Sequence, residues 1–193
     1  MKRLLSITFL SFLLIVTTSI SELRAQEDIR GFNKGKIIPQ LGIGLGSYGY
    51  GPIGGFRPMI PIIFGIEGGV HDYVGVGGYV GLGTRAYSGR SERYTGLSSG
   101  VRGTFHFYNM IEDLTGAELY TVKLDIYVGL LLGYERYFWS DDNINSFNGR
   151  FFGGGIVGIR YYPTNVFGIY AEFGRNVLSF VNFGVAFRLG RKN

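Results

Sequence analysis

Residues 120–139, YTVKLDIYVGLLLGYERYFW, form an apolar run that nevertheless carries charges at Lys123, Asp125 and Glu135. Every second residue from Tyr120 to Tyr134 is apolar or aromatic, whereas the residues between them are mostly polar or small. A period of two is typical of a β-strand whose two faces contact different surroundings. The run therefore predicts a strand and not a membrane-spanning helix.

Similar alternating segments recur along the chain and are separated by turn residues. They cover residues 36–48, 60–70, 74–87, 96–108, 120–139, 150–162, 167–174 and 180–190. A tilted strand of about 9–11 residues crosses a bilayer, and an even number of strands lets a sheet close with both ends on one side. The 33 glycines among 193 residues disfavour helices. The sequence thus predicts an all-β fold, an eight-stranded antiparallel up-and-down transmembrane β-barrel.

The first 25 residues have the features of a secretory signal peptide. Lys2 and Arg3 precede an apolar stretch over residues 4–16, and a polar run ends at Ala25. The alternative, an uncleaved anchor, is disfavoured because the apolar core is shorter than the ~20 residues of a membrane span. We expect cleavage before Gln26, which leaves residues 26–193 as a single barrel domain.

Charge and cysteine content exclude several classes of protein. Removal of residues 1–25 leaves 16 basic against 13 acidic residues, a net charge of about +3, which is too small to indicate nucleic acid binding. The absence of cysteine excludes disulfides and lipid attachment at a cysteine.

Charged residues within the predicted strands favour a membrane barrel over the alternative, a soluble periplasmic β-protein. They lie on the glycine-rich face, where they could not form the core of a soluble sandwich without a large cost in free energy. The interior of a narrow barrel accommodates small residues and a few long ones. We predict that these charges pair across the lumen and fill it, with His106 facing the same space; the alternative is that they line a path for a solute or an ion. The predicted lumen charges are Glu67, Arg85, Arg102, Lys123, Asp125, Glu135, Arg150, Arg160, Glu172 and Arg188.

Aromatic residues gather near the predicted strand ends, where amphipathic rings are enriched at membrane interfaces. The predicted interface aromatics are Tyr87, Tyr134, Trp139, Tyr161 and Phe187. Counted from a periplasmic N-terminus, the outer connections are mostly long, and residues 109–118 form an unusually long periplasmic one. Because proline deletes a hydrogen-bond donor, we expect Pro39 and Pro61 near strand ends.

Three stretches carry a resemblance to a known family: GVHDYVGVGGYVGLG (69–83), GIRYYPTNVFGIYAEFG (158–174) and FVNFGVAFRLG (180–190). They resemble the small eight-stranded outer-membrane β-barrels of Gram-negative bacteria, the porin-like or outer membrane protein beta-barrel domain group that includes OmpA-, OmpX- and OmpW-type proteins. The resemblance implies a monomer in the cell outer membrane, contact with outer-membrane lipid and lipopolysaccharide, and the barrel-assembly machinery as a partner in biogenesis. The final strand is similar to the signal read by that machinery, although RLGRKN follows its aromatic Phe187.

The residues themselves do not indicate an enzyme. His71 is predicted in a periplasmic turn and His106 faces inward, so neither is placed for catalysis, and two distant histidines are a poor metal-ligand set. Near matches to the G-x-G-x-x-G pattern do not open a helix, so we expect no cofactor. The predicted function is structural in the cell envelope or mediated by the extracellular loops, whose partner the sequence does not identify. The alternative is passive OmpW-type transport of a small solute.

Overall fold

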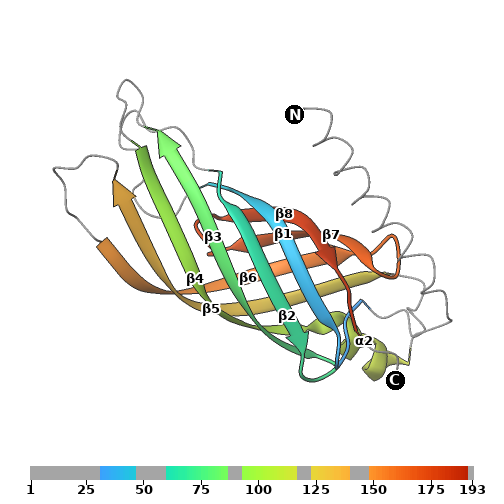
Figure 1. Ribbon diagram of the computed structural model, residues 1–193. Helices are drawn as coiled ribbons and strands as arrows, with labels where there is room; N and C mark the ends of the chain where they lie inside the picture. The colour runs from blue at the N-terminus through green and yellow to red at the C-terminus, as the bar shows by residue number, and fades with distance from the viewer. Residues whose placement is uncertain (1–30, 47–59, 87–92, 117–122, 140–147, 191–193) are drawn as a thin grey trace, which may run out of the picture.

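The structure, a computed structural model, describes residues 31–46, 60–86, 93–116, 123–139 and 148–190. The predicted signal peptide lies outside these ranges. Within them, eight antiparallel strands pair in sequence order and β1 closes on β8, so the predicted barrel is confirmed (Figure 1). The elements are β1 (Ile37–Leu45), β2 (Ile62–Gly69), β3 (Val74–Ala86), β4 (Arg93–His106), α2 (Phe107–Thr115), β5 (Leu124–Trp139), β6 (Asn148–Tyr161), β7 (Phe167–Gly174) and β8 (Val181–Phe187).

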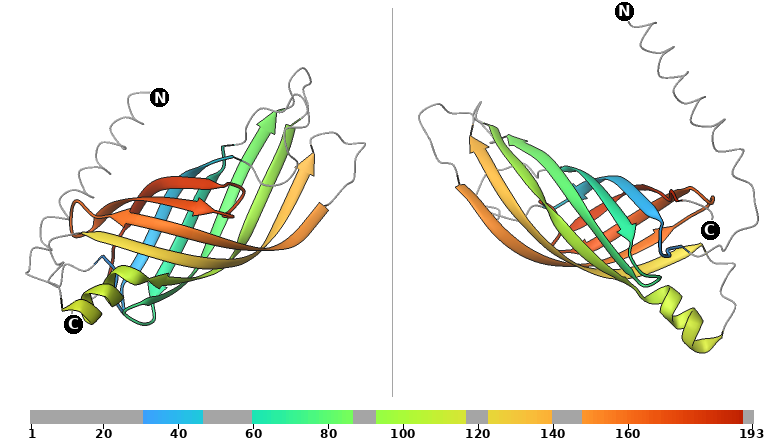
Figure 2. Two further views of the ribbon diagram at one scale, coloured as in Figure 1. Left: turned by 180° about the vertical axis from the view of Figure 1, so that it is seen from behind. Right: turned by 60° about the horizontal axis from the view of Figure 1, so that its bottom comes forward.

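The barrel wall is taller on one side than on the other. Strands β3 to β6 have 13 to 16 residues, whereas β7, β8, β1 and β2 have 7 to 9. The ladder between β6 and β7 accordingly ends at Ile156, and the rest of β6 pairs with β5 alone among the described strands. The four long strands extend beyond the short ones at the end opposite α2 (Figures 1 and 2).

Helix α2 was not predicted, because residues 109–118 were expected to form an irregular connection. The strand ends at His106, and the next nine residues contain no glycine or proline and place Phe107, Ile111 and Leu114 at helical spacing. Tyr73 donates a hydrogen bond to Asp113 and ties the helix to the turn between β2 and β3. No helix in the described part of the chain is long and apolar enough to cross a membrane.

The two prolines differ in their positions. Pro61 directly precedes β2, as expected, whereas Pro39 is the third residue of β1 and not at its end. The β1–β8 ladder runs from Gln40 to Leu45, and a separate bridge joins Ile37 to Leu189. Pro39 lies between these two stretches of pairing, which is where a missing N–H interrupts a ladder.

The strands alternate between a lumen face and an outer face as predicted, and the outer face forms an apolar belt. Arg136 is an exception that the prediction overlooked: it lies on the outer face of β5, and its guanidinium packs over the Phe138 ring at 5.1 Å. Because a soluble protein would not expose a continuous band of large apolar side chains, the belt is a lipid-facing surface. Its exposed members include Leu41, Ile43, Ile62, Phe64, Ile66, Val76, Val80, Leu82, Leu97, Val101, Leu130, Leu132, Val157, Ile159, Ile169, Phe173 and Phe183.

Candidate functional site in the barrel lumen

A cluster of buried polar side chains occupies the lumen between β1, β2, β4, β5, β6 and β7. We call it the lumen network; its members are Gln40, Glu67, Arg102, Thr104, His106, Asp125, Tyr127, Arg160 and Glu172. Each projects from an inward position of its strand, and together they bring residues up to 93 positions apart into contact.

Glu67 lies at the centre of the lumen network. Its Oε2 accepts hydrogen bonds from Arg160 Nη2 at 2.6 Å and from Arg102 Nη2. Its Oε1 accepts from Thr104 Oγ1 at 2.9 Å and lies 2.9 Å from His106 Nε2. A buried carboxylate is tolerated when it is paired and hydrogen-bonded in this way, so Glu67 joins both arginines into one unit.

His106 connects Glu67 to a second carboxylate. Its Nδ1 lies 2.7 Å from Asp125 Oδ1, and Arg160 Nη1 donates to Asp125 Oδ2 at 3.1 Å. The imidazole is fully buried because the Phe32 ring stacks on it in parallel, with 3.5 Å between ring centroids. Phe32 belongs to the segment before β1, so residues 31–36 cover the lumen network from the end where α2 lies.

Glu172 closes the other side of the lumen network. It accepts hydrogen bonds from Arg102 Nη1 at 2.9 Å, from the Tyr127 hydroxyl at 2.7 Å and from Asn176 Nδ2 at 2.5 Å. The Arg160 guanidinium lies 4.1 Å from the centre of the Tyr127 ring, a cation–π arrangement.

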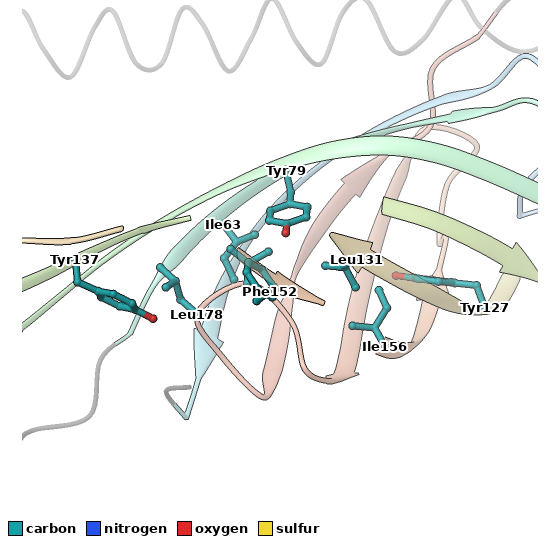
Figure 3. Packing of buried hydrophobic residues seen from close by; sticks show 9 residues of the cluster. Ile63, Tyr79, Tyr127, Leu131, Tyr137, Phe152, Ile156 and Leu178 are labelled. Atoms are coloured by element: carbon teal, nitrogen blue, oxygen red, sulfur yellow. The ribbon is translucent and has the colours of Figure 1, made fainter. Parts of the chain in front are cut away.

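The connection between β7 and β8 folds into the lumen. Asn176, Val177, Leu178 and Ser179 are all buried, and Leu178 adopts a left-handed backbone with φ 55°. Val177 and Leu178 belong to an apolar cluster that also includes Tyr127 of the lumen network, and Figure 3 shows Leu178 among the members of this cluster. The other members of this cluster are Ile63, Tyr79, Tyr127, Leu131, Tyr137, Phe152 and Ile156.

Inward glycines make room for these groups. A Cβ at Gly81 would overlap Val177, and a Cβ at Gly75 would overlap both Glu67 and Thr104. The glycine-rich lumen face predicted from the sequence therefore has a specific cause: it admits an inserted connection and large polar side chains.

Five of the ten predicted lumen charges lie outside the lumen network or outside the described side chains: Lys123, Arg188, Arg150, Glu135 and Arg85. Lys123 precedes β5 and donates to the Pro163 carbonyl at 3.2 Å. Arg188 follows β8, where its Nε donates to the Asn165 carbonyl at 3.0 Å. Arg150 is 46% exposed and pairs with Glu135 at 3.0 Å near the far end of the barrel. The Arg85 side chain lies outside the part that the structure describes.

Glu135 forms a smaller polar group of its own. Besides Arg150, it accepts a hydrogen bond from the Tyr137 hydroxyl at 2.9 Å. The nine predicted charges whose side chains are described thus divide into a central network of five and separate groups toward the two ends of the barrel.

The predicted interface aromatics lie on the outer face where they can be located. Tyr134 packs edge-to-face against Phe151, with 5.1 Å between ring centroids, on the tall side of the wall. Tyr161 and Phe187 lie at the opposite end, on the last residues of β6 and β8. Tyr87 and the Trp139 side chain lie outside the described part of the chain.

Sequence reasoning missed Gln40, Thr104 and Tyr127 as network members, although their inward positions were evident from the alternation. It also missed Phe32 and the buried connection between β7 and β8. A signal was available for the latter, because Val177 and Leu178 are an apolar pair in a connection expected to contact solvent.

The lumen network is built for ion pairing and offers no accessible reactive group. Its carboxylates are engaged by arginine, histidine, tyrosine or asparagine donors, and His106 is covered by Phe32. A general base needs to reach a proton on a substrate, and no described network residue faces an opening.

Comparisons with known proteins bear on the fold. No protein-family model and no curated protein sequence matches the chain. Among solved structures, the outer membrane protein OprG from Pseudomonas aeruginosa matches with a TM-score of 0.55 and 10% identity, covering 83% of this chain and 99% of OprG.

Two further solved structures match less well. The N-terminal β-barrel domain of Pseudomonas aeruginosa OprF has a TM-score of 0.49 and 16% identity, covering 81% of this chain and 99% of that domain. Ail, the attachment invasion locus protein of Yersinia pestis, has a TM-score of 0.47 and 13% identity, covering 80% of this chain and 95% of Ail. The closed barrel and the likeness to OprG lead to one conclusion: this chain has the fold of the small eight-stranded outer-membrane β-barrels.

Proposed function

We propose that this protein is an integral outer-membrane β-barrel with a closed lumen, which acts in envelope structure or through its outer loops and not as an open pore. The apolar belt, the signal-like first 25 residues and the fold shared with OprG support the outer-membrane location. The single observation that carries the proposed role is the filling of the described part of the lumen by Phe32, the lumen network and the inserted connection between β7 and β8.

Each layer of this filling opposes the passage of a solute. An ion would have to displace buried pairs such as Glu67 with Arg160, and breaking such a pair costs about 3–5 kcal/mol. A neutral solute would meet the apolar cluster that Leu178 completes, where no side chain can move aside without leaving a void. A narrow eight-stranded barrel leaves room for little else.

Planar-bilayer recording tests this function. Purified protein that has inserted as a folded barrel should give no steady conductance, because the lumen is filled. A matched variant, Val177→Gly with Leu178→Gly, removes the apolar side chains of the inserted connection and should leak more than the parent. Large, stable and voltage-insensitive steps from the parent would contradict a closed lumen. Uptake of a small apolar solute by cells that depends on this protein would favour passive transport through the wall instead.

A further inference from the structure

The outer face of the barrel carries glycines that the fold does not require. A Cβ at Gly103 would meet no atom within 4 Å, and one at Gly155 would meet only the Gly129 carbonyl oxygen at 3.9 Å. Neither glycine has a positive φ. A larger apolar residue would stabilise a strand that faces lipid, and glycine within a strand often marks the close approach of a ligand or another backbone.

These two glycines are in register on the two strands that flank β5. Gly103 of β4 pairs with Leu130 of β5, and Leu130 pairs in turn with Gly155 of β6. They line a groove of about 660 Å³ on the outer wall, with walls formed by side chains such as Phe105, Val157 and Phe173. Ligand sites in proteins are typically about 300–1,000 Å³ and mostly apolar, and this groove has both properties.

We propose that this groove is a binding site for one acyl chain of a membrane lipid. The groove is continuous with the apolar belt. The inference rests on the proposed function, because lipid hydrocarbon is present at the opening of the groove when the barrel spans the outer membrane. An unfilled groove would forfeit dispersion contacts along its walls, whereas a slender chain restores them. Leu130 projects from the groove, 74% exposed, so a flexible chain that bends around it fits better than the wall of a second barrel.

The position of the groove selects the source of the lipid. Its lining begins at Val74, the first residue of β3, and Phe105, the second-last residue of β4, and runs across the wall to Gly174, the last residue of β7. Val74 and Phe105 lie at the barrel end where β1 begins and β8 finishes, which is the periplasmic end in the proposed function, so a chain that enters there extends along the groove toward the middle of the membrane. The chain therefore comes from a phospholipid of the periplasmic leaflet.

Photo-crosslinking in lipid tests the site. The barrel is inserted into phospholipid vesicles that contain phosphatidylethanolamine with a diazirine in its acyl chain, and adducts are located by mass spectrometry. Adducts should be several-fold enriched at Phe105, Leu130 and Val157 relative to Leu41 and Ile62, which lie on the belt outside the groove.

Two variants that fill the groove should remove this enrichment. Gly103→Val and Gly155→Val have room for their side chains, so both should fold. Gly153→Val is the matched control, because Gly153 is an outer-face glycine of β6 whose Cβ would have no neighbour closer than 3.8 Å, yet it does not line the groove. Enrichment should persist in this control.

Four results would overturn the inference. Even labelling around the belt of an inserted parent, or enrichment that survives Gly155→Val, would mean that no acyl chain is held there. A covalent dimer formed when a photoreactive amino acid replaces Leu130 would identify a second barrel as the occupant. A parent that fails to insert would overturn the proposed function as well, whereas the other results leave that function intact.

Discussion

Replacing Glu67 by Gln removes the carboxylate that joins the two buried arginines of the lumen. All four of its contacts are with donors: Arg102 and Arg160 through Oε2, and Thr104 and His106 through Oε1. The glutamine amide has the same shape but presents an N–H₂ group to one of these donor pairs. The substitution therefore removes a charge and also leaves donors facing each other.

The loss in free energy of unfolding follows from the hydrogen-bond partners that each arginine keeps in Glu67→Gln. Arg102 keeps Glu172 and Gln40, and Arg160 keeps Asp125, so two charge-assisted hydrogen bonds are lost rather than the whole network. At about 1.5–3 kcal/mol for each such bond, the loss is roughly 3–6 kcal/mol. This range agrees with the general cost of removing one partner of a buried ion pair, which is about 3–5 kcal/mol.

Urea unfolding in phospholipid vesicles measures this loss. Glu67→Gln, Arg160→Gln and the double variant form a thermodynamic cycle, and residues that share a network couple by about 0.5–3 kcal/mol. Glu135→Gln is the matched control: Glu135 is also a buried carboxylate, but it pairs with a single arginine, Arg150, whose side chain is 46% exposed and can be solvated when the charge is removed, so its loss should be smaller. If Glu67→Gln cost no more than this control and showed no coupling to Arg160→Gln, the lumen would be hydrated and the reasoning for a closed barrel would be refuted.

Three further predictions concern the wall, the inserted connection and the N-terminus. Leu130→Arg should lower the free energy of unfolding in urea by about 2–4 kcal/mol, and Leu124→Arg, at the first residue of β5, should lower it less, because the cost of a lipid-facing charge is greatest near the bilayer midplane. Equal reductions would place the membrane elsewhere on the barrel. Gly81→Ala should lower the free energy of unfolding by about 1–3 kcal/mol because the new methyl group crowds Val177, and adding Val177→Ala to the same chain should restore part of that stability. If the effects of the two substitutions simply add, the contact between residues 81 and 177 is not made. Protein from the outer-membrane fraction should begin at Gln26 on N-terminal sequencing, and an intact Met1 in the inner membrane would contradict the predicted location.

The sequence by itself determined the fold and the face of each strand. Alternation is a local property, because successive side chains of a strand point to opposite sides. The run at residues 120–139 therefore identified Asp125 and Glu135 as lumen residues and Ile126 and Leu130 as outer residues before any contact was known. The number of such runs then indicated a closed barrel.

Only the tertiary structure decided which lumen residues meet. Lys123 and Asp125 were assigned to one face, yet Asp125 pairs with Arg160 whereas Lys123 lies before the strand and contacts Pro163. Depth along the barrel depends on the stagger between strands, and alternation carries no information on that stagger. The burial of the connection between β7 and β8 was equally undetermined, because it depends on space that remains only after all eight strands have closed. Helix α2 differs, because the helical spacing of Phe107, Ile111 and Leu114 is a local signal that the prediction overlooked.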